Sequence, residues 1–363
     1  MEYEVIISRA SPYSSKVVAL LGYAGIPHRI RIQNAVSRYC VVKRLTGKTM
    51  VPVLRRGSWA LHDSTEISRY IMERTDKPTL PTKAGELMAW LLEDFADEWI
   101  VRWMVQSRWR HREDAEHVGE VIGRELTGKV PVGEKFVGRQ ASKMIRSQLK
   151  TGGMRRDNDQ AMQNSATRCL EALEAILSEG APYLFGGYPT VADFAFFGCL
   201  IQYYQDPTGR DRLQGYRAVR AYIRRLQEME DRPASAHVEP CAPRPLSELQ
   251  PLFGEMLGTY WPVLIANQSV LEGDDAWETG KRLREVSAEL IDGTNFSFRP
   301  SGYMMKRLFS LLELVDETYQ RGDRLFGEDG LRMERALVSR IADLSRSEAG
   351  RMILRSYEHL GLH

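Results

Sequence analysis

Three serines stand where their hydroxyl groups could help to bind an anion. Ser11, Ser14 and Ser15 separate a short β-branched run at residues 5–7 from apolar residues that recur at helical spacing from Val17 onward, so a strand leads into a helix through this turn. Unpaired backbone N–H groups and the positive end of the helix dipole meet at a helix N-terminus. The turn therefore suits a bound anion or thiolate. The simplest alternative is that a serine only caps the helix.

Two further segments add polar or special residues next to predicted strands. Pro52 lies inside the apolar run 50–54, where a proline fits an edge, a bulge or a special turn, and a cis Val51–Pro52 bond is one such arrangement. Asp63 and Ser64 follow the strand-like residues 59–62 and begin a D-S-T-E sequence of capping-box form. Apolar residues then recur at helical spacing, which predicts that a helix begins there.

The order of these motifs resembles that of the thioredoxin-like domain in the glutathione S-transferase superfamily. Residues 11–14, S-P-Y-S, are similar to the C-P-Y-C active site of glutaredoxins with both cysteines replaced by serine, in the manner of the serine-type transferases. Val51–Pro52 matches the cis-proline turn of the family, and Asp63–Ser64 matches its acid-serine pair. Asp63 departs from the pattern, since many relatives have glutamate there.

The resemblance implies a fold of class α/β plus all-α. A thioredoxin-like N-terminal domain would be followed by an all-helical glutathione transferase C-terminal domain and, in this chain, by a helical extension. Residues 187–194, G-Y-P-T-V-A-D-F, are similar to the buried capping box of the helical domain. We predict domains at 1–80, 83–230 and 246–363, with the proline-rich residues 232–245 as an extended connector.

Two regions outside these motifs are harder to assign. Residues 127–157 are rich in Gly, Lys and Arg and weakly periodic, so we predict a loop with a short helix inside. Helical periodicity recurs at 249–271, 302–319 and 330–357, and residues 293–302 are expected to form a short strand or loop. The extension could pack over the active-site cleft, alter a dimer interface or enlarge the core, and the sequence leaves these three possibilities open.

The resemblance also implies roles for individual residues. Ser11 would donate its hydroxyl to the sulfur of bound glutathione and stabilise the thiolate, with Ser14 as the second candidate for this contact. A redox enzyme needs a cysteine at position 11 to form a mixed disulfide, which a serine cannot do. The residues expected to bind glutathione are Tyr13, Val51, Pro52, Asp63 and Ser64, and those expected to line the pocket of the second substrate are Glu98, Arg102 and Trp103.

These roles predict a glutathione transferase. Glutathione would be a co-substrate whose thiolate attacks an electrophilic small molecule, either to form a conjugate or to isomerise a double bond. Family habit predicts a homodimer. A second hypothesis is a binding or scaffold protein that has lost turnover, which Asp63 and the long extension would favour. A third is an enzyme that uses the cleft for a ligand other than glutathione.

Composition argues against several other classes of protein. The 363 residues are 43% hydrophobic and 27% charged, and the formal net charge of +2 comes from interspersed basic and acidic residues, so we expect no nucleic-acid partner. The four cysteines form no C-x-x-C pair and no metal-ligand spacing, so we predict no metal site and a reducing, cytoplasmic location. No signal-like N-terminus and no long apolar run is visible, so we expect no membrane partner.

Overall fold

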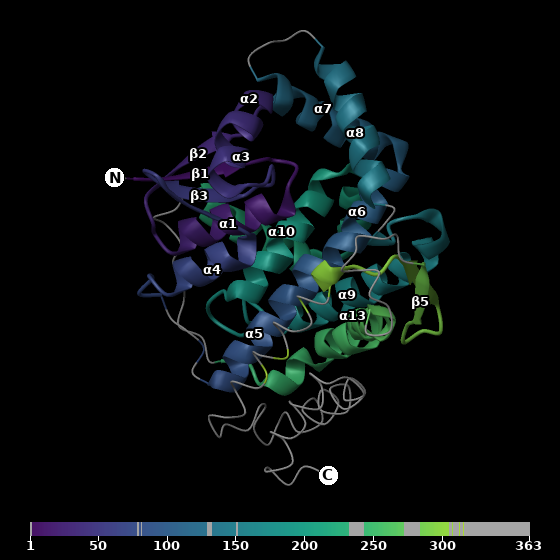
Figure 1. The fold of residues 1–363 in the computed structure, drawn as a ribbon. Coiled ribbons are helices and arrows are strands. Elements are labelled where there is room, and N and C mark those ends of the chain that lie inside the picture. The colour runs from purple at the N-terminus through teal and green to yellow at the C-terminus, as the bar shows by residue number, and fades with distance from the viewer. Residues whose placement is uncertain are drawn as a thin grey trace.

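The computed structural model describes residues 2–77, 80, 82–128, 133–149, 152–231, 243–271, 284–304, 307, 312 and 315. A small sheet with flanking helices forms its N-terminal part, and helices form most of the remainder (Figure 1). The helix expected at 330–357, most of that expected at 302–319 and most of the connector at 232–245 lie outside the described residues. The three domain boundaries inferred from the sequence stay predictions.

A four-stranded sheet carries the N-terminal part, with the strand order β2-β1-β3-β4. Strands β1 and β2 are parallel and joined by α1, while β3 pairs antiparallel with both β1 and β4. This is the thioredoxin-like arrangement that the resemblance implies. The elements are β1 (Tyr3–Ile7), α1 (Pro12–Tyr23), β2 (His28–Ile32), α2 (Ala35–Ser37), η1 (Arg38–Val42), α3 (Lys43–Thr46), β3 (Val53–Arg56), β4 (Trp59–His62) and α4 (Ser64–Met72).

Helices make up the following part, which confirms the predicted fold class. One nearly continuous helical rod begins it, because α5 runs into α6 through a short π-helical segment, η2. The elements are α5 (Lys83–Phe95), η2 (Ala96–Ile100), α6 (Val101–Arg110), α7 (Arg112–Thr127), α8 (Glu134–Leu149), α9 (Asp159–Ser178), α10 (Val191–Gln205), α11 (Pro207–Arg212) and α12 (Arg217–Asp231), with short 3-10 turns at Arg156–Asn158 and Leu213–Gly215.

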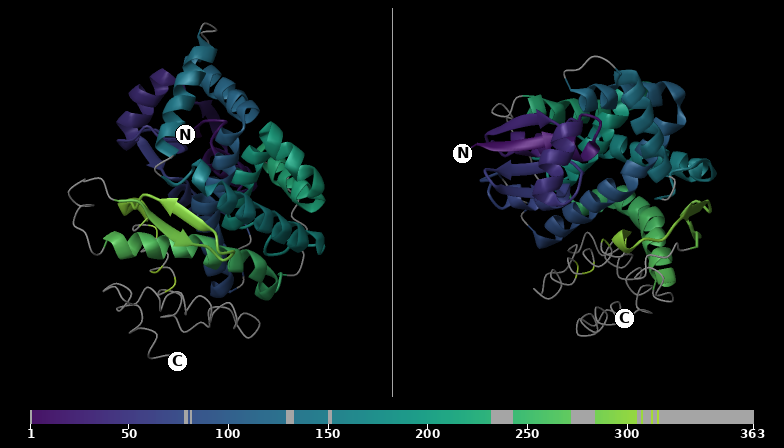
Figure 2. Two further views of the ribbon diagram at one scale, coloured as in Figure 1. Left: turned by 90° about the vertical axis from the view of Figure 1, so that its right-hand side faces the viewer. Right: turned by 45° about the horizontal axis from the view of Figure 1, so that its top comes forward.

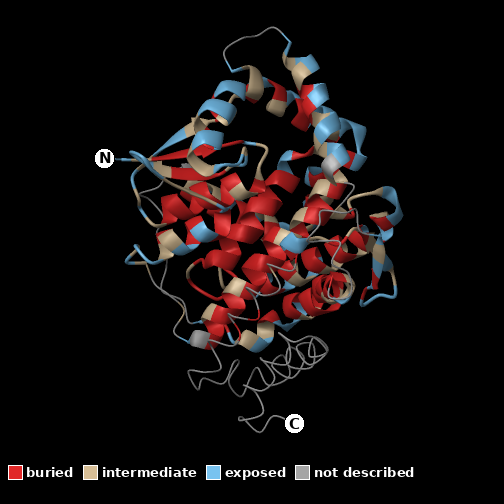
Figure 3. Ribbon diagram, in the orientation of Figure 1, coloured by how far each residue is buried: buried red, intermediate tan, exposed pale blue. Residues whose placement is uncertain are grey.

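Helix α10 lies at the centre of the molecule. All its residues from 191 to 203 are buried, as expected for a helix that is apolar nearly all round (Figure 3). It packs against α1 and α5, so it joins the sheet-containing part to the helical part. The backbones come very close at Gly198, where a Cβ atom would lie 2.4 Å from the carbonyl oxygen of Pro12.

The expectation of a loop with a short helix at 127–157 was wrong for most of that stretch. Helix α8 takes up 16 residues of it and packs along α7 at the edge of the molecule (Figure 1). The two helices approach closely at glycines: a Cβ atom on Gly123 of α7 would lie 2.2 Å from Glu134 O, and one on Gly138 of α8 would lie 2.2 Å from Gly119 O. Gly138 therefore marks close helix packing, whereas Gly128, Gly133 and Gly153 have positive φ and lie outside α8.

The extension adds a further helix and a hairpin to the helical part. After a 3-10 turn at Leu246–Leu249, helix α13 (Gln250–Leu271) packs against α9 and α5. Strands β5 (Val286–Glu289) and β6 (Asn295–Phe298) form an antiparallel hairpin that runs alongside α13 (Figure 2). Arg168 of α9 fixes both elements, since it pairs with Glu255 at 2.6 Å and with Asp292 at 2.8 Å.

The contact of α10 with α1 predicts a strong effect of one added methyl group. Gly198→Ala should lower the free energy of unfolding by about 1–3 kcal/mol, because the new Cβ meets backbone that cannot move aside. Gly254→Ala is the matched control, since nothing lies within 4 Å of the position that its Cβ atom would take and alanine favours the helix by about 0.8–1 kcal/mol. Urea unfolding measures both, and wild-type stability for Gly198→Ala would contradict the close packing.

Candidate active site

Three segments singled out in the sequence meet at one edge of the sheet. Ile6 of β1 lies opposite Val53 of β3, and Val53 lies opposite His62 of β4. The residues just beyond these pairs are the serine turn after β1, Pro52 before β3 and Asp63 after β4. The register therefore brings all three candidate glutathione-binding segments together. The Val51–Pro52 peptide bond is cis.

The two candidate serines differ in exposure. Ser11 is the N-cap residue of α1 and is half-buried, and its Oγ accepts a hydrogen bond from the Ser14 N–H at 3.3 Å. Ser14 is 1% exposed, and its Oγ accepts from the Ser8 N–H at 3.3 Å. A hydroxyl oxygen that accepts as a cap still has its proton to donate. Ser11 is thus both a cap and an accessible hydroxyl donor.

Helix α7 holds the turn that precedes Ser11. Glu125 accepts hydrogen bonds from the Ser8 hydroxyl and from the Arg9 N–H, both at 2.6 Å. Burial raises the pKa of Glu125, although these two hydrogen bonds favour the carboxylate. Nothing in the local sequence pointed to Glu125, which lies more than a hundred positions along the chain from its partners.

Buried groups on α6 and α10 hold the same turn from another side. Arg108 pairs with Asp206 at 2.7 Å and donates to the Ala10 carbonyl oxygen at 3.1 Å. The side-chain amide of Gln202 donates to the Arg9 carbonyl oxygen at 2.8 Å. Sequence reasoning missed these residues too, because their roles depend only on tertiary contacts.

The acid-serine pair has an unusual backbone and a partner in the helical part. Asp63 has φ 81°, and its carboxylate accepts from the Thr65 N–H at 3.0 Å. Such a conformation costs roughly 1–3 kcal/mol for a residue other than glycine, and these outliers cluster at functional sites. The Ser64 hydroxyl donates to Asp97 Oδ2 at 3.3 Å.

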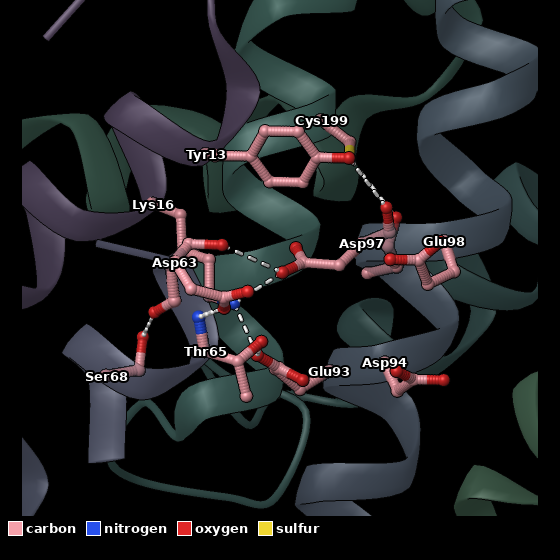
Figure 4. Close-up of polar contacts among 12 residues, drawn as sticks. Tyr13, Lys16, Asp63, Thr65, Ser68, Glu93, Asp94, Asp97, Glu98 and Cys199 are labelled. Carbon is pink, nitrogen blue, oxygen red and sulfur yellow. Dashed lines mark hydrogen bonds and ion pairs between the residues drawn. The ribbon is translucent and has the colours of Figure 1, made fainter. Parts of the chain in front are cut away.

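A buried ion cluster lies directly behind this pair (Figure 4). Lys16 of α1 is 0% exposed, and its ammonium donates to Glu93 at 2.5 Å and to Asp97 at 2.7 Å. Burial alone would lower the pKa of Lys16, but the two carboxylates outweigh it and the pKa is raised. Burial also raises the pKa of Asp97 to about 6, against the opposing effect of Lys16. The Thr65 hydroxyl donates to Glu93 at 2.7 Å.

The sequence contained one signal for this cluster. Lys16 stands directly before the apolar residues 17–21 of a helix that turns out to be buried on nearly all sides. A lysine in such a place is almost never left unpaired. Its acidic partners could not be named without the fold.

Tyr13 links the serine turn to the π-helical segment η2. Its hydroxyl donates to the backbone oxygen of Asp97 at 3.0 Å. Glu98, the next residue, is half-buried, and burial together with nearby Asp94 raises its pKa to about 7, while two neighbouring arginines oppose the shift. A carboxyl group that changes charge near neutral pH therefore lies beside the Tyr13 contact (Figure 4). Helical segments of π type are often found at functional sites.

The extension also contacts the helical rod formed by α5 and η2. The Tyr303 hydroxyl donates to Glu98 Oε1 at 2.8 Å, and Arg307 Nε donates to Asp94 Oδ1 at 2.6 Å. The sequence left the position of the extension open. Its described part contacts the helix that borders the candidate site. Sequence reasoning identified neither Tyr303 nor Arg307.

The three residues expected in the second-substrate pocket take different positions. Glu98 lies near Tyr13, as described above. Arg102 donates to the Gly152 carbonyl oxygen at 2.9 Å, and its guanidinium lies 5.9 Å from the ring centre of Phe296. Trp103 is buried edge-to-face against Tyr203 and lines a different cavity, of about 290 Å³, between α6, α9 and α11. Arg102 and Trp103 thus contact other parts of the helical region, and Glu98 is the member that lies next to the Tyr13 contact.

Neither a metal centre nor a membrane span is found in the described part of the chain. Within the described ranges, no group of three or more His, Cys, Asp or Glu side chains is placed to hold a metal ion. None of the helices described here is long and apolar enough to cross a membrane.

Comparison with protein families agrees with this geometry. The model of the glutathione S-transferase N-terminal domain matches residues 5–79, and the model of the C-terminal domain matches residues 158–225. Residues 5–79 and 158–225 thus match the two domains of the glutathione S-transferase superfamily. Residues 80–157 and those after 225 lie outside both matches. A search of curated proteins found no match.

Several solved structures are similar to part of the chain. A GST-like protein from Pseudomonas syringae has 19% identity and a TM-score of 0.45, with 63% of this chain and 67% of that chain covered. The beta-etherase LigF from Sphingobium sp. strain SYK-6 has 16% identity and a TM-score of 0.45, with coverage of 64% and 99%. The Tau class glutathione S-transferase of mango, Mangifera indica, has 13% identity and a TM-score of 0.40, with coverage of 62% and 88%.

The buried ion cluster predicts a large loss of stability on removal of its cation. Lys16→Met should cost about 3–5 kcal/mol of unfolding free energy, because Glu93 and Asp97 are left buried without a counter-charge. The loss should be smaller at pH 5 than at pH 8, since protonation of Asp97, whose pKa burial raises, removes one of the two unpaired negative charges. Urea unfolding at the two pH values measures this.

Arg112→Met is the matched control for that experiment. Arg112 pairs with Glu116 on the exposed face of α7, so its replacement should cause no measurable loss. If the two variants lost the same stability, the cluster would not have the role described.

Proposed function

We propose that the protein is a glutathione transferase in which Ser11 stabilises the thiolate of bound glutathione for attack on an electrophilic small molecule. The observation that carries the proposal is the accessible Ser11 hydroxyl at the N-terminus of the 12-residue helix α1, at the edge where Pro52 and Asp63 also lie. Conjugation and double-bond isomerisation both fit this arrangement. Ser11 is preferred to Ser14 because Ser14 is buried.

The energy needed is within reach of this turn. A thiol with a pKa of about 8.5 is only a few per cent ionised at pH 7, and lowering the pKa by two units requires about 2.7 kcal/mol. A hydrogen bond to a charged group contributes roughly 1.5–3 kcal/mol, and a helix N-terminus adds roughly 0.3–1 kcal/mol. Ser11 with α1 is therefore sufficient.

The other glutathione contacts follow from the same edge of the sheet. In this proposal the backbone at Val51–Pro52 pairs with the cysteinyl part of glutathione, and Asp63 and Ser64 hold its γ-glutamyl end. Ser64 is supported by its bond to Asp97, which ties its hydroxyl to the buried ion cluster. Glu98 and Tyr13 would then face the second substrate. A homodimer and a cytoplasmic location complete the proposal by analogy with the family.

One observation favours a second candidate function, a glutathione transferase-like binding or scaffold protein without turnover. Tyr303 of the extension bonds to Glu98, the pocket residue nearest the Tyr13 contact. An extension that stays in this position could keep an electrophile out. Turnover with small electrophiles distinguishes the two functions.

Calorimetric titration with glutathione, combined with rate measurements, tests the roles of the serines. Ser11→Ala should lower turnover by about 10- to 100-fold, the equivalent of one hydrogen bond to a charged group, and should largely keep glutathione affinity. Ser64→Ala should weaken binding. Ser14→Ala is the matched control and should leave thiolate reactivity close to that of the wild type.

Either of two results would count against the assigned roles. Unchanged turnover in Ser11→Ala would remove Ser11 from the mechanism. Absence of glutathione binding by the wild type would favour a different ligand for the cleft.

A further inference from the structure

Glu98 is held between two parts of the chain that are far apart in sequence. Its Oε1 accepts the hydroxyl of Tyr303, 205 positions further on. The side-chain amide of Asn267 on α13 fixes the backbone just before Tyr303, because it accepts from the Ser301 N–H at 2.8 Å and donates to the Ser301 carbonyl oxygen at 3.3 Å. The extension therefore determines where the Tyr303 hydroxyl lies.

The serine turn contacts the backbone next to Glu98. Tyr13 comes two residues after Ser11, and its hydroxyl reaches the backbone oxygen of Asp97, the residue before Glu98. The first turn of α1 therefore lies one tyrosine side chain away from the backbone next to Glu98. The Glu98 side chain is half-buried, so part of its surface is open to a small molecule.

On the basis of the function proposed above, we propose that Glu98 is the proton donor to the second substrate and that Tyr303 is its positioning residue. The favoured substrates are then electrophiles that add the thiolate, such as α,β-unsaturated carbonyl compounds. Residues after 225 lie outside the family match, so Tyr303 would be supplied by the chain's own extension, while Glu98 comes from η2.

The addition step needs one proton and no oxidant or reductant. The sulfur electron pair forms the new C–S bond at the β-carbon, and the π electrons of the C=C bond move to form an enolate. The carboxyl proton of Glu98 passes to the α-carbon and leaves the carboxylate. The proton released when the next glutathione thiol ionises restores the acid. Substitution on an aryl halide differs, because the halide departs with its electron pair and the carbon needs no proton.

Charged and titratable groups from every neighbouring element act on Glu98. Burial and the like charge of Asp94 on α5 raise its pKa to about 7, so at neutral pH both the acid and its conjugate base are present. Three groups favour the carboxylate and so lower the pKa of Glu98. They are Arg307 and Tyr303 of the extension and Arg102 of α6. Tyr13 of α1, Asp97 of η2, Asp63 before α4 and Tyr260 of α13 are the other titratable groups nearby.

Two probe substrates separate proton donation from thiolate activation. We would measure turnover of full-length wild type, Glu98→Gln and Tyr303→Phe with 1-chloro-2,4-dinitrobenzene, a substitution electrophile, and with 4-phenylbut-3-en-2-one, an addition electrophile. Glu98→Gln should slow the enone reaction by about 100-fold or more and change the halide reaction by less than about threefold.

Tyr303→Phe tests the positioning role through the pH profile. The acid form of Glu98 is the active one, so the enone rate should fall as the pH rises through its pKa. Loss of the Tyr303 hydrogen bond removes a group that lowers this pKa, so the alkaline limb should move up by about one pH unit. Tyr39→Phe, at an exposed tyrosine elsewhere, should leave the limb in place.

The possible outcomes distinguish the inference from the function on which it rests. An equal slowing of both substrates by Glu98→Gln, or no slowing of the enone reaction, would overturn the role of Glu98 and leave the transferase function intact. An unmoved alkaline limb in Tyr303→Phe would overturn the role of Tyr303. A wild type that binds glutathione and converts neither probe would overturn the proposed function and the inference together.

Discussion

The buried ammonium of Lys16 is the constraint on which the rest of the site depends. An uncompensated charge in a protein interior is very costly, so Lys16 requires that Glu93 and Asp97 remain within hydrogen-bond distance. Lys16 is on α1, whereas its partners are on α5 and η2. The ion pairs therefore hold α1, whose N-cap is Ser11, against the helical rod formed by α5 and η2. Hydroxyl groups from the start of α4 add to the same cluster, which thus joins α1, α5, η2 and α4.

Additional contacts hold the site from two directions. Glu125 and Arg108 fix the backbone before Ser11, and Tyr303 and Arg307 contact the wall formed by α5 and η2. All four residues lie outside the two family matches. Contacts from segments outside the two family matches thus surround the candidate site. Preorganisation of this kind places functional groups accurately only when their supporting contacts are also fixed.

The sequence predicted features that depend on local order. The strand-to-helix turn at Ser11, the proline before β3 and the helix start after Asp63 each follow from a few neighbouring residues, and the pattern of such motifs was sufficient for the fold class. The pairs that complete the site could not be found in this way. Glu125 and Tyr303 meet their partners over more than a hundred positions, and no local pattern records such a contact.

Helix α8 shows why composition alone can mislead. Glycine usually marks turns, but Gly123 and Gly138 allow the backbones of α7 and α8 to approach closely. The distinction depends on what lies opposite each glycine, which is a tertiary property. Trp103 is a second example, since it lies on a helix that was expected to border the substrate pocket, while its side chain packs beside a separate cavity.

The π-helical segment η2 has a consequence for how this site tolerates insertions and deletions. Successive residues of an α-helix are rotated by about 100°, so one extra residue changes the direction of every later side chain relative to the earlier ones. Before η2 the rod points Glu93 at Lys16, and after it the same rod points Arg108 at the backbone before Ser11. A lineage that lost one residue here would keep a continuous helix, yet the contact of Arg108 and the buried positions of Trp103 and Met104 would be displaced together. Chain length at this point therefore sets both the support of the turn before Ser11 and the packing of α6.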